Sequence, residues 1–224
     1  MKHIELKLPA KLNFLIMLSG LVILLIPSCT IIRLERKVDD GSTSLTKSDS
    51  LAIKPFSISD FNITRTYATP DEIKFQVIDA EQMNELVKRQ RYSWIVLGAS
   101  WCGVSKMALT KFPQIIHSFN PDSIRLIIII QDLNIPVMQK ELFDAHFTFF
   151  PYLLSSAKYG TDEAHKQENF AKDLQWDLPL RYFNEGGVPM NIIVDNDKNV
   201  KCLFHGIRIT TDSISKYTGL VRLN

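Results

Sequence analysis

Alternation of apolar and polar residues predicts strands and helices over most of the chain. The segment 72–77 alternates as a strand with one buried face does. Asp79 and Gln82 then have the spacing of a capping box, which predicts the start of a helix. A short apolar segment at 94–98 predicts a strand buried on both faces. The β-branched run at 124–130 predicts a central parallel strand.

Helical periodicity follows the predicted strand at 94–98. In 105–119 apolar residues recur every three or four positions, and Pro113 predicts a kink there. Alternation of strands and helices predicts an α/β fold, a central mixed sheet flanked by helices. The remaining predicted elements are a helix at 137–147, a strand or extended piece at 149–154, a helix at 161–176, two strands joined by an Asp/Asn-rich turn within 188–207, and a helix at 211–221.

The first 28 residues have the pattern of an export signal. Three lysines precede the apolar run 14–27, as in a signal peptide. Ser28 followed by Cys29 resembles the lipobox of bacterial lipoproteins, which implies that Cys29 is diacylated and becomes the first mature residue. An uncleaved membrane anchor is the alternative, because the apolar character continues to Ile32.

Either interpretation implies that the rest of the chain is exported and tethered to a membrane. The lipoprotein resemblance implies the periplasmic side of a bacterial cell envelope. We expect a signal peptide at 1–28, a lipid-anchored tether and linker at 29–70, and a folded domain at 71–224. Within the linker, 38–50 is polar and aperiodic, which is typical of a flexible spacer. The segment 51–70 is ambiguous and would add an edge strand or pack on the domain surface.

Composition and charge exclude some functions. Hydrophobic residues make up 46% of the chain, enough for a packed core. The net charge is +2, and beyond residue 28 acidic and basic residues are equal in number, without a basic run that would bind nucleic acid. With Cys29 assigned to lipid, Cys102 and Cys202 do not make a disulfide framework.

The candidate chemistry lies in the segment 101–106, Trp-Cys-Gly-Val-Ser-Lys. Cys102 falls where the strand 94–98 gives way to a helix. Unpaired N–H groups and the helix dipole favour a thiolate at that position, and Ser105, one turn further on, would donate a hydrogen bond to the sulfur. Cys102 is therefore predicted to be a better nucleophile than an ordinary thiol. A buried structural cysteine is the alternative.

This segment and the order of the elements resemble the thioredoxin superfamily, and are similar to its membrane-tethered TlpA and ResA branch. The resemblance covers residues 72–221. It rests on the W-C-G-x-x-K turn after a strand, the Gly-Gly-Val-Pro sequence that ends at Pro189, the hairpin after it, and Gly206 at the end of the last strand. It implies a thioredoxin-like fold with a helical insertion at 136–180, before the proline.

The resemblance also implies a site. Pro189 would be a cis-proline opposite Cys102, and the Val188 backbone would be offered to an extended partner peptide. We assign the catalytic role to Cys102, assisted by Ser105. The residues predicted to bind the partner are Trp101, Gly103, Val104, Val188 and Pro189.

Two groups that complete the dithiol reaction of thioredoxins are missing. Ser105 stands in place of the second sulfur, and Val96 in place of the buried acid six residues before the active cysteine. In the sheet order of the family, Cys202 would lie two strands away from Cys102, about 9.5 Å at ordinary strand spacing. That exceeds the about 7 Å that a disulfide allows between Cα atoms, so Cys202 is predicted to be a small core residue.

Other titratable residues are weaker candidates. Cys202 and His205 would point to opposite faces of a strand, so we expect no metal site. Asp132 and Glu185 could border the cleft or be ordinary loop carboxylates. The histidines predicted to lie on solvated helix faces are His117 and His165.

Two functions remain open from the sequence. In the first, Cys102 exchanges disulfides with envelope proteins or peptides as a monothiol, and an external thiol completes the cycle. In the second, the protein is a redox-inactive module that binds an extended segment of an envelope partner. The C-G-x-S string also resembles monothiol glutaredoxins that hold iron–sulfur clusters, but export and the flanking Trp101 and Lys106 argue against a cofactor.

Overall fold

The computed structural model describes residues 47–180, 183 and 187–223. The predicted signal segment, Cys29 and Glu185 lie outside the described residues. Among the helices that are described, none combines the length and the apolar character needed to cross a membrane.

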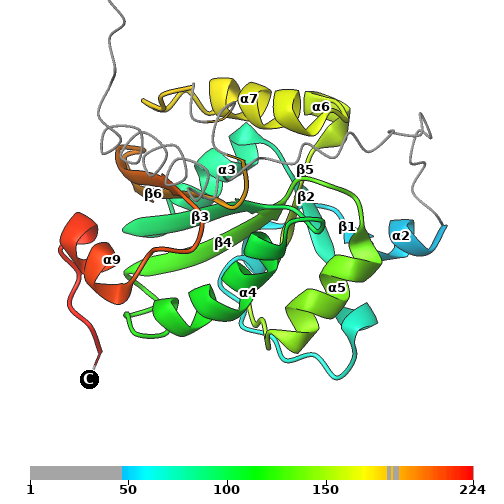
Figure 1. Cartoon of the computed structure of the whole chain (residues 1–224), viewed down its shortest axis with the longest axis horizontal. Helices are drawn as coiled ribbons and strands as arrows, with labels where there is room; N and C mark the ends of the chain where they lie inside the picture. The colour runs from blue at the N-terminus through cyan, green and yellow to red at the C-terminus, as the bar shows by residue number, and fades with distance from the viewer. Residues whose placement is uncertain (1–46, 181–182, 184–186, 224) are drawn as a thin grey trace, which may run out of the picture. The chain divides into compact units, whose positions relative to one another are not determined.

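Seven strands in the described part of the chain form one mixed sheet. They are β1 (Ile53–Lys54), β2 (Phe75–Ile78), β3 (Tyr92–Gly98), β4 (Ile124–Ile130), β5 (Tyr152–Leu154), β6 (Met190–Asp195) and β7 (Val200–His205). Their order across the sheet is β1-β2-β5-β4-β3-β6-β7 (Figure 1). The strands from β1 to β3 in this order run parallel, whereas β6 is antiparallel to β3, and β7 to β6.

Helices cover both faces of the sheet (Figure 1). One face packs against α4 (Gly103–Ile116), α5 (Ile135–Asp144) and α9 (Thr211–Thr218). The other packs against α3 (Ala80–Val87), α6 (Ser156–Tyr159) and α7 (Glu163–Leu174). This arrangement confirms the predicted thioredoxin-like α/β fold.

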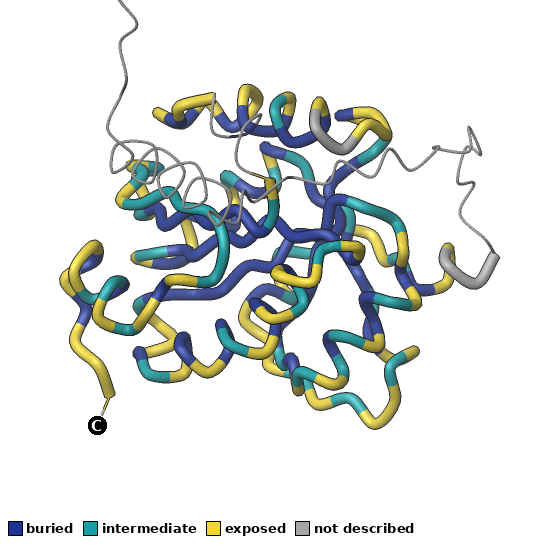
Figure 2. The backbone as a smooth tube through the Cα atoms, viewed as in Figure 1, coloured by how far each residue is buried: buried dark blue, intermediate teal, exposed yellow. Residues whose placement is uncertain are grey.

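The centre of the sheet is buried on both sides (Figure 2). In β4, Leu126, Ile128 and Ile130 pack toward α4 and α5, and Ile127 and Ile129 pack toward α3 and α7. A strand with two buried faces needs apolar residues on both, which is why six of the seven residues in 124–130 are apolar; the exception is Arg125, whose guanidinium lies over the rings of Phe61 and Phe149. Every residue of β4 is buried, as the sequence predicts for a central strand.

The packed unit includes residues before the predicted boundary at residue 71. Strand β1 pairs in parallel with β2 and forms an edge of the sheet, one of the two alternatives for 51–70. The chain continues through α2 (Lys47–Ala52) before this strand and two 3₁₀ turns, η1 (Ile58–Asp60) and η2 (Pro70–Glu72), after it. Phe61 is buried, and its ring lies 5.5 Å from the guanidinium of the buried Arg125.

The predicted insertion contributes a strand as well as helices. Residues 136–180 hold most of α5 together with β5, α6 and α7, and β5 pairs with β2 on one side and β4 on the other. The sequence of β5 is consistent with either a strand or an extended piece, and the structure shows the strand. The insertion is therefore part of the central sheet.

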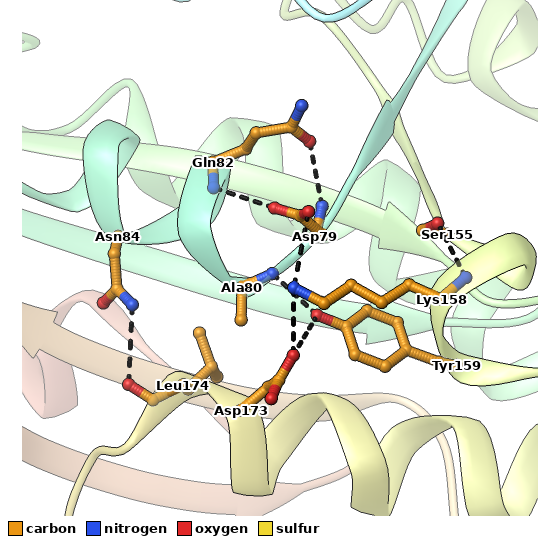
Figure 3. A network of polar contacts seen from close by, with 9 residues as sticks. All are labelled: Asp79, Ala80, Gln82, Asn84, Ser155, Lys158, Tyr159, Asp173 and Leu174. Atoms are coloured by element: carbon orange, nitrogen blue, oxygen red, sulfur yellow. Dashed lines mark hydrogen bonds and ion pairs between the residues drawn. The ribbon is translucent and has the colours of Figure 1, made fainter.

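Polar contacts attach the helices of the insertion to α3 (Figure 3). Asp79 caps α3 with the predicted capping box. Lys158 Nζ lies 3.5 Å from Asp79 Oδ2 and 3.0 Å from Asp173 Oδ2 in α7. The hydrogen bond with Asp173 raises the pKa of the Lys158 ammonium. The Tyr159 hydroxyl accepts a hydrogen bond from the backbone N–H of Ala80 and donates one to Asp173. These contacts fix α7 beside α3.

The turn of the β6–β7 hairpin provides a stability prediction. Asp195 accepts hydrogen bonds from the Asn199 backbone N–H (2.8 Å) and from Lys201 Nζ (2.8 Å). Partial burial acts to raise the pKa of Asp195, but the hydrogen bonds from Lys201 and Asn199 outweigh it and lower this pKa to about 2. Asp195→Asn is expected to lower the unfolding free energy by about 1–2 kcal/mol at pH 7.

The effect of Asp195→Asn should depend on pH. The wild-type carboxylate has a lower pKa in the folded chain than in the unfolded one, so its contribution is complete above about pH 4 and is lost as the pH falls toward 2. Urea unfolding of both chains at pH 7 and near pH 2.5 measures the difference. An equal deficit at both pH values would contradict the assignment.

Candidate active site

Cys102 lies at the predicted junction between strand and helix. Strand β3 ends at Gly98, and Cys102 is the N-cap of α4, which begins at Gly103. Its backbone N–H donates to the Ala99 carbonyl at 3.2 Å, and its own carbonyl accepts from the Lys106 N–H, so the residue is held in the first turn. The side chain is partly exposed. A thiol in this place is accessible to a partner and close to the positive end of the helix dipole.

The sulfur of Cys102 faces the segment before Pro189. Cys102 Sγ lies 3.2 Å from the carbonyl oxygen of Val188, to which the thiol donates a hydrogen bond. The peptide bond between Val188 and Pro189 is cis. Residues 86 positions apart in the sequence therefore meet at one point, as the resemblance implies.

The carbonyls on either side of Val188 are held by the β6–β7 hairpin. The Gly206 N–H donates to the Pro189 carbonyl at 2.8 Å, and His205 Nδ1 lies 3.0 Å from the Gly187 carbonyl. Gly206 has a φ of 81°, in the left-handed region that favours glycine. The segment 187–189 thus has all three of its carbonyls engaged, the middle one by the Cys102 thiol.

A buried polar relay beneath the site joins the strands on which it is built. Trp94 Nε1 in β3 donates to Asn191 Oδ1 at 3.1 Å, and Asn191 Nδ2 in β6 donates to the Gly206 carbonyl at 2.9 Å. Trp94 and Asn191 are both fully buried, and the Trp94 ring lies 4.5 Å from that of Phe112 in α4. Trp94 therefore contacts the helix that begins after Cys102, and through Asn191 it is connected to the hairpin that holds Pro189.

Ser105 makes a different contact from the predicted one. Its side chain is buried, and Ser105 Oγ accepts a hydrogen bond from the Ala99 backbone N–H at 3.3 Å. Among the described residues no hydrogen bond joins it to the sulfur of Cys102, which is turned toward Val188 instead. Ser105 stabilises the turn that carries the cysteine, because it satisfies an N–H in the 99–102 loop.

The groups that complete the dithiol reaction are absent from the site within the described residues. Val96 is buried in the apolar core at the position of the acid, and Ser105 carries no sulfur. Cys202 is in β7, with β6 between it and β3, and both cysteines are free thiols. Burial raises the pKa of the Cys202 thiol, and a hydrogen bond with Tyr217 offsets this in part. Cys202 is thus a poor nucleophile near neutral pH.

Exposed apolar side chains flank Cys102, one just before it in the sequence and two in the first turns of α4. Trp101 is 55% exposed, Val104 37% and Met107 53%. Gly103 is also exposed and begins α4, and a side chain there would meet no atom within 4 Å. Met107 was not among the predicted binding residues. Its signal is its spacing, three after Val104 and outside the buried face that contains Ala108 and Leu109.

Asp132 acts as a loop carboxylate near the site. Its Oδ2 accepts from the Ser100 backbone N–H at 2.6 Å, and its Oδ1 accepts from the Asn134 N–H at 3.1 Å. The carboxylate thereby ties the end of β4 to the loop that leads to Cys102. Lys106 pairs with Glu141 at 2.8 Å, which leaves little net charge on this side of the cysteine.

The other candidates lie apart from the cysteine. His117 is exposed and its ring stacks on Phe149, and His165 is exposed beside Asp162. His205 contacts Gly187, and Cys202 faces the core on the side of α4, so the two do not converge. No cluster of three or more His, Cys, Asp or Glu side chains suited to a metal ion occurs in the described part of the chain.

Several solved structures are similar to this chain. The thioredoxin domain of a thiol-disulfide oxidoreductase from Bacteroides vulgatus matches with 13% identity and a TM-score of 0.43, over 58% of this chain and 81% of that one. A thiol:disulfide interchange protein of the thioredoxin family from Chlorobium tepidum matches with 12% identity and a TM-score of 0.44, over 70% and 92%. StoA from Bacillus subtilis matches with 16% identity and a TM-score of 0.39, over 58% and 84%.

Sequence comparisons give no further assignment. No family model matches the chain, and no curated protein matches it. Identities as low as those of the solved structures do not assign an activity to this chain, so its function has to be argued from the site itself.

Proposed function

We propose that this protein is an exported, membrane-anchored monothiol that exchanges disulfides with proteins or peptides of the bacterial envelope through Cys102. The observation that carries the proposal is the contact of the partly exposed Cys102 thiol with the Val188 carbonyl at 3.2 Å. It puts one sulfur beside the backbone of the segment 187–189, which leads into β6. The N-terminal pattern, with Cys29 as the lipidated residue, supports export and anchoring.

The reaction follows from a single sulfur. The Cys102 thiol loses its proton to solvent, and the thiolate attacks one sulfur of a partner disulfide. That S–S bond breaks, a new one forms between Cys102 and the partner, and the leaving thiolate takes up a proton. An external thiol then attacks the mixed disulfide, releases Cys102 and restores its proton. Each step exchanges one disulfide for another, so no further oxidant or reductant is needed.

The hydrogen bonding of the Val188 carbonyl would depend on whether Cys102 is a thiol or part of a disulfide. The reduced thiol donates a hydrogen bond to the Val188 carbonyl, but a sulfur in a disulfide has no proton to donate. The carbonyl is then free to accept an N–H from the partner backbone, in the manner of a strand added to an exposed edge. Partner binding is thereby strengthened when the mixed disulfide forms.

A second function is a redox-inactive binding module. The observations in its favour are the exposed apolar side chains of Trp101, Val104 and Met107 and the lack of a resolving group in the described site. Such a module would hold an extended apolar segment against the Val188 backbone without covalent chemistry.

Trapping the covalent intermediate separates the two functions. The purified full-length chain is incubated with a model peptide disulfide, quenched with an alkylating agent and mapped by mass spectrometry. Exchange predicts a peptide adduct on Cys102 that an added thiol removes. Binding of the reduced peptide with no adduct would support the binding module instead, and the absence of both would overturn both functions.

A further inference from the structure

A fully buried lysine reaches the carboxyl end of the central sheet from the insertion. Lys166 in α7 is 1% exposed, although lysine is almost never buried without partners. Its Nζ donates to the backbone carbonyl of Gln131 at 2.8 Å and to Ser156 Oγ at 2.8 Å. One amino group thus joins α7, the first residue of α6 and Gln131, the residue that follows β4.

Gln131 is directly connected to the loop that carries Cys102. The Gln131 backbone N–H donates to the carbonyl of Gly98, the last residue of β3, at 3.1 Å. The next residue, Asp132, accepts from the Ser100 N–H at 2.6 Å. Residues 131–132 therefore hold both ends of the segment 98–100, and Cys102 follows two residues later.

The insertion contacts the side chain of Gln131 as well as its backbone carbonyl. Gln167, next to Lys166 in α7, donates from its side-chain amide to Gln131 Oε1. Gln131 and Gln167 are both buried. Because Gln131 is buried, replacing Lys166 by an apolar side chain removes a donor from its carbonyl where water does not substitute for it, and the corner at 131–132 is expected to shift.

We propose that Lys166 is a positioning residue that sets the reactivity of Cys102 through Gln131 and the loop 98–102. The inference deepens the proposed function, on which it rests, because it assigns control of the reactive sulfur to the insertion. A shifted loop carries Cys102 away from the first turn of α4 and from Val188, so the sulfur is no longer held in the position from which it reacts.

The test is the alkylation rate of Cys102 in the full-length chain with iodoacetamide, a neutral reagent. Lys166→Met is expected to slow alkylation at pH 7 by about threefold to tenfold, the loss that corresponds to a helix-terminus interaction. The alkylation profile, which is the rates at Cys102 and at the partly buried Cys202 measured side by side, should change at Cys102 alone. A general loss of stability would instead speed alkylation of Cys202.

Two matched variants separate positioning from folding. Ser156→Ala removes one acceptor of Lys166 and keeps the bond to Gln131, so the alkylation profile should stay that of the wild type. Lys172→Met, on the same helix but exposed in a pair with Glu168, should also leave it unchanged. Thermal unfolding of every variant shows that each chain is folded at the temperature of the assay.

Specific results would overturn the inference. They are a Cys102 alkylation rate in Lys166→Met within twofold of the wild type, or equal changes in Lys166→Met and Ser156→Ala. Alkylation needs only the Cys102 thiol, so it still tests Lys166 in a chain that exchanges no disulfide. Failure of the trapping experiment therefore remains distinguishable from failure of this inference.

Discussion

Cys102→Ser is expected to abolish the trapped peptide adduct completely. A serine hydroxyl is far less acidic than a thiol and cannot form a disulfide, so no mixed disulfide is possible at position 102. The fold should survive, because the side chain is only partly buried and its one contact, to the Val188 carbonyl, can be made by a hydroxyl. The measurement is the fraction of chain that carries the peptide after quenching, by intact mass and peptide mapping.

Cys202→Ser is the matched control for this loss. Cys202 is half-buried in β7, and burial raises the pKa of its thiol, so it should contribute little adduct. Adduct yield in Cys202→Ser should stay near that of the wild type. An adduct that survives Cys102→Ser and disappears in Cys202→Ser would place the reactive sulfur in β7 and would refute the proposed function.

Local patterns were enough to predict most of the elements. The capping box at Asp79 and Gln82 forms as expected, because both of its hydrogen bonds lie within one turn. The run at 124–130 could be assigned to the centre of the sheet, because six of its seven side chains are apolar and a strand buried on both faces is the kind that needs them. The Asp/Asn-rich turn likewise predicted the hairpin that β6 and β7 form.

Contacts between distant segments explain what the patterns did not predict. Strand β5 is three residues long and gains its place from β2 and β4, far from it in the chain. Strand β1 has only two residues, too few for any period to be read. The segment 51–70 is consequently ambiguous from its sequence, although Phe61 within it is buried.

The candidate site was predicted in outline and not in its contacts. The approach of Cys102 to Val188 is what the family resemblance implies, but the partner of Ser105 depends on how the loop turns after Gly98. There the hydroxyl oxygen accepts a hydrogen bond from the Ala99 N–H. Lys166 gives no signal in the sequence, since a lysine in a mostly charged helix is expected to be solvated. Its burial becomes evident only once α7 is docked on the sheet.

Ser105→Cys is expected to convert the trapped adduct into a transient one. Position 105 is one helical turn from Cys102, and neighbouring turns fall within the range that a disulfide allows between Cα atoms. The introduced thiol would attack the Cys102 sulfur of the mixed disulfide, release the peptide as a thiol and leave a disulfide within the chain. Because this attack is intramolecular, the adduct should decay roughly tenfold faster or more than in the wild type.

Ser105→Ala separates the added sulfur from the loss of the hydroxyl. It removes the hydrogen bond to the Ala99 N–H, at a cost of about 1 kcal/mol in unfolding free energy, but supplies no nucleophile. Its adduct should persist as in the wild type. If the adduct persists equally in Ser105→Cys, the introduced thiol stays buried in the place of the Ser105 side chain and does not reach the Cys102 sulfur. The protein would then depend on an external thiol by geometry as well as by composition.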